Sequence, residues 1–292
     1  MSNNTQNKDL SLWERINQDQ ALINRLHRAV AVVVLILVLL WLFFPIFWAL
    51  ETALKTRAVT VQSPPVFWGF DVQWQNFIQV WTETALPTYI FNGLLIATVT
   101  TILSLLLGVP HAYAISMYQS RIGDASLLLV TVTRIIPPIT ILVPIYFIFS
   151  SLGLINTKIA IIIAQTAFLE PFAVWIVKGS FDGKSSSLID SARTDGCTKF
   201  QAFYKIMIPV SLPGIMSAAT ITWLLAWTTF LSVFLLATGP KAQTVPVGVF
   251  ALAQDTFTPW NLISAAAIIG AIPSLVLVSV FQKYIIRGLV EQ

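Results

Sequence analysis

The chain has 292 residues, of which 56% are hydrophobic and only 10% are charged, and its formal net charge is +4. A soluble domain carries about 25% charged residues, so this composition excludes an ordinary soluble protein and indicates an integral membrane protein. A single cysteine, Cys197, excludes a disulfide framework within the chain, and no cluster of cysteines and histidines indicates a metal site.

The first 88 residues divide into a polar tail, an apolar run and a loop. Residues 1–28 are polar and no small-residue cleavage site follows them, so we expect a cytoplasmic tail and not a signal peptide. Residues 29–50 carry no charge and are long enough to cross a hydrocarbon layer of ~30 Å. We interpret residues 29–88 as a first span with an external loop, whose tryptophans indicate a packed or interfacial segment.

Five further windows are apolar enough to cross a membrane and contain only two charged residues, Arg134 and Glu170. They are residues 89–117, 125–151, 159–177, 206–240 and 256–282. The prediction is an all-α polytopic membrane protein with six transmembrane helices, in which residues 89–286 form a five-helix core and residues 287–292 a cytoplasmic end. Residues 239–260 form a second long outer segment. Each of the two outer segments either caps the bundle or faces an external partner.

Orientation follows from the basic residues. Of the seventeen Lys and Arg residues, twelve fall on the side that holds both termini, four fall on the other side, and Arg134 lies within a span. Because basic residues concentrate on the cytoplasmic side, both termini are predicted to be inside. The loop of residues 178–209, between the fourth and fifth spans, is then cytoplasmic.

That loop contains a polar island, with five charges in the sixteen residues from Asp190 to Lys205. Ser187 and Asp190 have the spacing of a helix cap, so a short helix is predicted over Leu188 to Asp195. Gly196 tolerates the positive φ that ends a helix.

A second helix is predicted from Lys199 to Ile208, capped by Thr198 and stopping before Pro209. Its apolar stripe consists of three residues at helical spacing. They are Phe200, Phe203 and Met207. The resulting helix–turn–helix has a small-residue face that fits a groove on a partner, although an amphipathic loop lying on lipid headgroups is the alternative.

The island resembles the coupling-loop motif of permease subunits in binding-protein-dependent ABC importers. The residues that fill the motif without a gap are Asp190, Ser191, Ala192, Gly196, Ile206, Ile208 and Pro209. The family prefers Glu-Ala-Ala at the start and Leu-Pro at the end, and each departure here keeps the size or charge class. The six-span plan, with the loop between spans four and five, matches the family as well.

Within that family, the third and fourth spans resemble the carbohydrate-uptake class, which includes the smaller permease subunit of the maltose importer. Four stretches carry this resemblance. They are RIIPPI from Arg134, PIY from Pro144, LGLINT ending at Thr157, and PFAVW from Pro171.

The resemblance implies four partners in the assembly: a second permease subunit, two ATPase subunits and an external solute-binding protein. The chain itself would lie in the lipid bilayer of the cell membrane, and no nucleic acid is implied. ATP and Mg would be held by the ATPase subunits, and this chain would bind no cofactor. The residues assigned to ATPase coupling are Asp190, Ser191, Ala192, Asp195, Gly196, Phe200, Phe203, Ile206 and Pro209.

No enzyme activity is predicted for the chain alone. The stretch from Gly179 to Ser185 places three residues between its glycines, where a phosphate-binding loop needs four, and it follows a membrane helix and not a strand. No nucleophile with a base, and no carboxylate pair, indicates a catalytic site.

Polar groups within the spans mark a candidate solute path. Arg134 and Glu170 lie at similar depth, where a lone charge is costly, so we expect them to pair or to share a wet cavity. Such a pair either locks two helices or contacts solute. His111 is interpreted as a satisfied helix-end histidine. The candidate path residues are Asn92, Arg134, Gln165, Glu170, Trp223 and Trp227, each with lipid or packing contact as the alternative.

The leading interpretation is a permease subunit of an ATP-driven importer for a sugar or a sugar-like solute such as an oligosaccharide, polyol or glycoside. The alternatives are a permease of the same fold for a non-sugar solute, an ion-coupled secondary transporter and a membrane scaffold. A secondary transporter would need more membrane carboxylates than the single Glu170.

Overall fold

The computed structural model describes residues 6–117, 121–182, 187–254 and 258–290, with the backbone alone for 6–22, 187 and 285–290. The chain divides into two compact units, residues 1–52 and 53–292. Every regular element in the described ranges is helical, which confirms the predicted all-α class.

The first unit is a single long helix, α1 (Gln6–Ala53), which continues through Pro45. Its side chains are exposed without interruption from Ile23 to Trp48. The predicted first span of residues 29–50 lies within this helix. A helix that is apolar on all faces suits lipid or a partner subunit.

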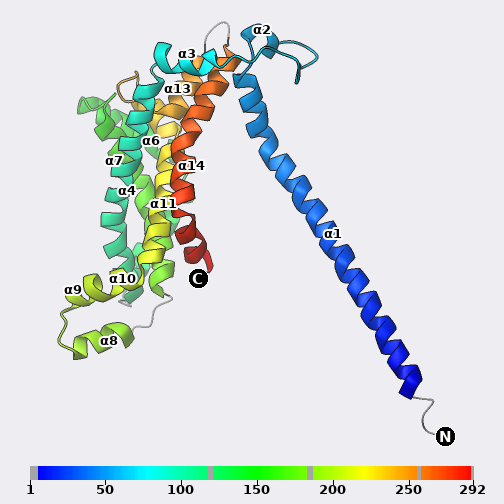
Figure 1. The fold of residues 1–292 in the computed structure, drawn as a ribbon. Helices are drawn as coiled ribbons and strands as arrows, with labels where there is room; N and C mark the ends of the chain where they lie inside the picture. The colour runs from blue at the N-terminus through cyan, green and yellow to red at the C-terminus, as the bar shows by residue number, and fades with distance from the viewer. Residues whose placement is uncertain (1–5, 118–120, 183–186, 255–257, 291–292) are drawn as a thin grey trace. The chain divides into compact units, whose positions relative to one another are not determined.

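The second unit is a bundle of helices with short elements at both ends (Figure 1). Its elements are α2 (Arg57–Thr60), α3 (Gln75–Glu83), α4 (Leu86–Met117), α5 (Arg121–Thr133), α6 (Pro138–Ser151), α7 (Lys158–Asp182), α8 (Ser187–Thr194), α9 (Lys199–Ala202), the π-turn η1 (Phe203–Met207), α10 (Ile208–Val210), α11 (Leu212–Thr228), α12 (Leu231–Leu236), α13 (Val245–Leu252) and α14 (Trp260–Val290). Figure 1 shows α3 and α13 at one end of the bundle and α8 to α10 at the other.

Four of the six predicted spans are continuous helices, and each of the other two corresponds to a pair of helices joined at a bend. Helices α1, α4, α7 and α14 are each long enough to cross a membrane, whereas α5 with α6 and α9–α10 with α11 are pairs bent by 95° and 74°. The bend in the first pair falls at Pro137–Pro138. Pro144 and Pro171 lie inside continuous helices, because a bundle can satisfy the backbone groups that proline frees.

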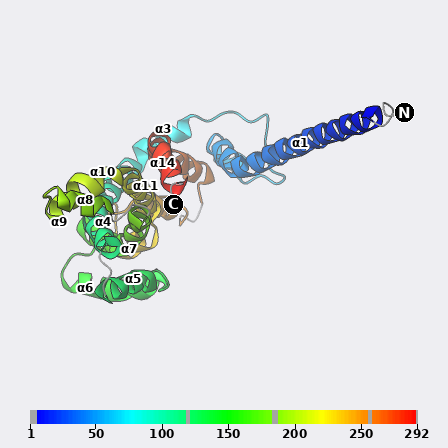
Figure 2. The same cartoon turned by 90° about the horizontal axis from the view of Figure 1, so that it is seen from below.

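Small residues let the helices approach closely at the centre of the second unit. At Gly108 in α4, an added Cβ would meet Ala173 and Val174 of α7 at 3.5 Å, and at Gly214 in α11 it would overlap Ser180 of α7. Because apolar side chains gain nothing from leaving lipid, close backbone approach of this kind holds membrane helices together. Helices α5 and α6 lie at one edge of this packed centre, as Figure 2 shows.

The loop of residues 237–244 is fixed by two asparagines, one in α4 and one in the turn before α7. Asn92 in α4 is fully buried, and its amide donates to the carbonyl oxygens of Gln243 at 2.8 Å and Pro240 at 3.0 Å. Asn156 has a φ of 62°, and its side-chain oxygen accepts from the Gly239 N–H at 3.2 Å. The LGLINT stretch that precedes α7 thus anchors this loop.

Candidate functional site

The first candidate site is the elbow, which we define as residues 187–211 at one end of the bundle. Its first helix, α8, ends as the sequence predicted, because Gly196 has a φ of +88° and its neighbourhood is open. Thr198 then begins α9 with a complete capping box, in which its side chain accepts from Gln201 N at 3.2 Å and the Gln201 side chain accepts from Thr198 N at 2.9 Å. The proposed cap at Ser187 and residues 183–186 lie outside the described side chains.

The second helix of the elbow does not stop before Pro209, which corrects the prediction. A π-turn, η1, absorbs one extra residue, so the chain continues helically through Pro209 to Val210. The bend into α11 falls at Ser211. Proline is tolerated here because it lies in the first turn of α10, where its missing N–H has no helical partner.

One face of the elbow packs against its own bundle. Met207 is fully buried, Ala192 is 4% exposed, and the ring of Phe203 lies 4.6 Å from that of Tyr113 in α4. Ala192 was expected to face a partner with Ser191, but its i+3 spacing from Ile189 places it on the buried face. The inward face therefore anchors the elbow.

The opposite face of the elbow is open. Phe200 was expected to join the packed stripe, but it is 71% exposed and contacts Tyr204 at a ring distance of 5.4 Å, because the π-turn shifts the helical register between Phe200 and Met207. Ile206 is partly buried against the core. The residues that remain exposed include Asp190, Ser191, Asp195 and Pro209.

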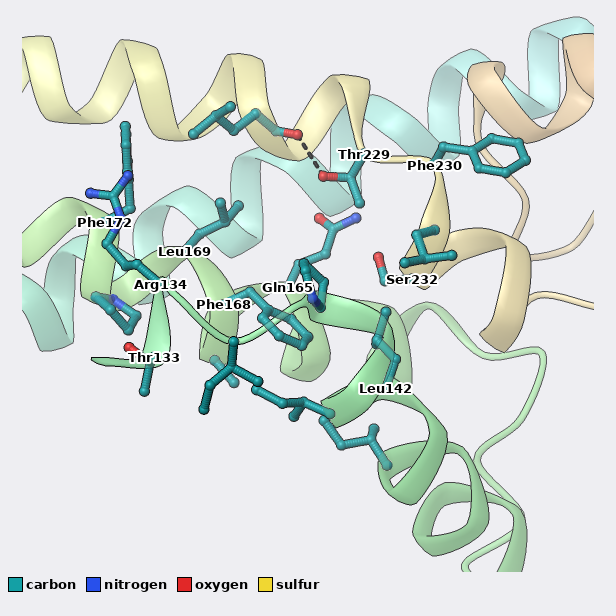
Figure 3. A pocket seen from close by; sticks show the side chains of 18 of the residues that line it. Thr133, Arg134, Leu142, Gln165, Phe168, Leu169, Phe172, Thr229, Phe230 and Ser232 are labelled. Atoms are coloured by element: carbon teal, nitrogen blue, oxygen red, sulfur yellow. Dashed lines mark hydrogen bonds between the residues drawn. The ribbon is translucent and has the colours of Figure 1, made fainter. Parts of the chain in front are cut away.

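The second candidate site is a cavity of about 740 Å³ in the second unit. Its walls come from the α5–α6 break, the middle of α7 and the α11–α12 break, and most of the lining is apolar or aromatic (Figure 3). Non-helical backbone at membrane depth is tolerated only against protein or a water-filled space, so two breaks on one cavity indicate a path.

Two buried polar side chains lie in the wall of this cavity. Gln165 of α7 is 2% exposed and Ser232 of α12 is 3% exposed, and neither finds a hydrogen-bond partner within the described part of the chain. Figure 3 shows Gln165 directed into the cavity near Thr229 and Ser232. An unsatisfied buried polar group costs about 1–3 kcal/mol, so these two side chains are poised for a ligand or water.

Arg134 lines the cavity too, at the break after α5. Its guanidinium lies 4.5 Å from the ring centre of Phe172 and 5.5 Å from that of Trp175, both in α7. Cation–π contact of this kind stabilises the charge by about 0.5–2 kcal/mol, less than the ~2.5–3.5 kcal/mol that a central charge costs on insertion.

The expected pair of Arg134 with Glu170 is not formed among the described residues, and only Arg134 reaches the cavity. The Glu170 carboxylate instead lies 2.9 Å from His111 Nδ1, and His111 Nε2 lies 2.5 Å from Ser126 Oγ. This network joins α4, α5 and α7. Glu170 has a nearer partner because α4 and α7 pack along most of their lengths, whereas α5 ends just before Arg134.

Three other candidate path residues lie away from the cavity. Asn92 holds the loop of residues 237–244, as described above. Trp223 and Trp227 are stacked on each other at 5.3 Å in the core, and Trp223 donates to Thr98 Oγ1 at 3.2 Å. Of the six predicted path residues, only Arg134 and Gln165 line the cavity. Ser232 also lines it but was not predicted, because no sequence pattern distinguishes it from a packed serine.

Helices long and apolar enough to cross a membrane, arranged around a cavity at the α5–α6 and α11–α12 breaks, define a polytopic membrane protein. The family model described as "Binding-protein-dependent transport system inner membrane component" matches residues 102–291, and the chain belongs to this family. The matched region contains the elbow and every residue that lines the cavity.

Relatives agree with this membership, and a solved structure shares the fold. The sulfoquinovosyl glycerol transport system permease protein of Agrobacterium fabrum is 30% identical over 84% of this chain and 86% of its own length. The trehalose/maltose transport system permease protein of Thermococcus litoralis is 27% identical over 90% and 95%. A chain of a bacterial ABC transporter that imports the acidic polysaccharide alginate shares the fold, with a TM-score of 0.72, 20% identity and coverage of 89% and 96%.

Proposed function

We propose that the chain is the membrane-spanning permease subunit of an ATP-driven importer for a sugar or sugar-like solute. The cavity at the α5–α6 and α11–α12 breaks carries this proposal, because it offers aromatic walls, hydrogen-bonding groups without partners in the described residues, and a volume within the roughly 300–1,000 Å³ of small-molecule sites. Relatives that transport a glycosyl glycerol and disaccharides favour a sugar over other solutes.

In this proposal the elbow transmits movement from ATPase subunits to the bundle. Its open face, with Asp190, Ser191 and Asp195, docks on an ATPase, and its buried face, with Ala192 and Met207, carries the displacement into α4, α7 and α11. ATP and Mg are held by the ATPase subunits, and this chain contributes no catalytic group. ATP-driven closure of the two ATPases then alternates the access of the cavity between the two sides of the membrane.

The remaining partners follow from the same model. A second permease subunit completes the path, and an external binding protein delivers the solute at the end opposite the elbow. The alginate importer has been solved with a solute-bound periplasmic protein, and one of its chains shares this fold with a TM-score of 0.67. Both termini and the elbow are placed in the cytoplasm by the distribution of basic residues.

Co-purification from the native membrane tests the proposal. The chain should retain an ATPase and a second permease, and Ser191→Trp on the open face of the elbow should release the ATPase. Trp68→Ala is the matched control, since Trp68 is 81% exposed in the loop before α3, and it should retain both partners. Purification of the wild-type chain with neither partner would support an independent transporter instead.

A further inference from the structure

We propose that the transported solute carries an anionic group, such as a sulfonate or carboxylate on a sugar, and that Arg134 binds this group. The inference rests on the proposed function and names the solute class for the same cavity. Three observations on the cavity support it: the sign of its charge, the state of the guanidinium, and the placement of its other polar groups.

The charge of the cavity is positive. Arg134 is the only charged side chain in its described lining, and no Asp or Glu lines it. The membrane carboxylate that was expected to neutralise Arg134, Glu170, is engaged by His111 at 2.9 Å. The site thus favours an anion over a neutral or cationic solute.

Two aromatic rings hold the Arg134 guanidinium in place, and its N–H donors are available to a ligand. Its contacts with Phe172 and Trp175 use the aromatic faces of α7, and no hydrogen bond or ion pair to Arg134 side-chain nitrogens occurs within the described ranges. A planar fork of N–H donors matches the oxygens of a carboxylate or sulfonate in bidentate geometry, and its hydrogen bonds are strengthened by charge.

The remaining polar groups match the rest of a sugar. Gln165 and Ser232 are buried, have no hydrogen-bond partner among the described residues, and lie in the wall away from Arg134, so they can exchange hydrogen bonds with hydroxyl groups. Phe168 lines the wall beside Gln165 and offers an apolar surface to a pyranose ring. A solute with an anionic group at one end and hydroxyls at the other satisfies all three polar side chains at once.

The inference is tested by measuring how two matched probes bind to the chain, purified with its partner subunits and without nucleotide. The external binding protein is left out, so its own solute preference does not affect the result. Sulfoquinovosyl glycerol and glucosyl glycerol differ only in a sulfonate against a hydroxyl at one sugar carbon. Titration in nanodiscs by saturation-transfer NMR should show about tenfold or greater preference for the sulfonated probe. Arg134→Gln should abolish that preference, Arg134→Lys should retain part of it, and Gln165→Ala should weaken both probes equally.

Lys158→Gln is the matched control, since Lys158 is a second cation stacked on a ring, 5.1 Å from the centre of Phe91, but it does not line the cavity. Its variant should keep the full preference. Equal binding of the two probes, a preference that survives Arg134→Gln, or binding of neither probe would overturn the inference. If the proposed function were wrong, no ATPase would co-purify with the chain. The preference between the two probes is a separate measurement, so the two failures can be distinguished.

Discussion

His111 lies between the Glu170 carboxylate and the Ser126 hydroxyl and ties the three helices α4, α5 and α7 together. The side chains of His111 and Glu170 are 31% and 21% exposed, so both are largely removed from solvent. Removing one partner of a buried polar pair lowers stability more than replacing both partners with apolar residues, because the remaining group is left unpaired. The network should therefore behave as a unit.

A double-mutant cycle measures this coupling. His111→Leu leaves Glu170 without its partner and should lower the stability of the purified protein by about 1–3 kcal/mol, seen as a lower Tm in tryptophan fluorescence. His111→Leu combined with Glu170→Leu should recover most of the loss. Additive effects of the two changes would show that the contact carries no coupling energy.

At the residue scale, the sequence predicted which side chains are exceptional but not how they combine. Arg134, Glu170 and Gln165 stand out because they are polar within apolar windows. Which of them meet depends on the relative rotation of α4, α5 and α7, and no single-sequence pattern encodes that rotation. His111 precedes the broken span α5–α6 in the sequence, Ser126 lies within it and Glu170 follows it, so no local pattern links the three.

At the scale of elements, the elbow depends on one backbone conformation. Gly196 has a φ of +88°, and no atom lies within 4 Å of the Cβ position, so the glycine is required for its backbone and not for space. Proline fixes φ near −65° and would redirect α9 away from α8.

Gly196→Pro should therefore abolish ATP-driven uptake in reconstituted vesicles while the chain still inserts and retains its bundle. Gly196→Asn is the matched control, because asparagine adopts positive φ more readily than other side chains, and it should keep most of the uptake. Wild-type uptake by the proline variant would contradict a coupling role for the elbow.

Most elements could be predicted from local signals, and the exceptions have physical reasons. Apolar windows located every span, and Pro137–Pro138 located the break between α5 and α6. The π-turn could not be predicted, because it arises where the packing of Phe203 and Met207 against α4 and α7 overrides the regular helical register. Pro209 was interpreted as a stop signal because proline usually ends a helix, and the sequence does not show the π-turn that precedes it.

For the whole molecule, the sidedness of the membrane topology follows from charge alone and is open to a direct test. The single cysteine, Cys197, permits a clean background in Cys197→Ala. In that background, a membrane-impermeant maleimide should label Lys283→Cys only in inside-out vesicles and Trp68→Cys only in intact cells. The reverse pattern would invert the assigned orientation of the importer.

The asparagine anchors of the loop at residues 237–244 have a thermodynamic consequence for recognition. Ordering one backbone residue costs about 1–2 kcal/mol of conformational entropy, and Asn92 and Asn156 have already immobilised this loop during folding. A protein that binds this loop does not have to order it, so binding costs little conformational entropy in the loop. The same rigidity means that a force applied at the loop reaches α4 and the start of α7 without being dissipated in flexible chain.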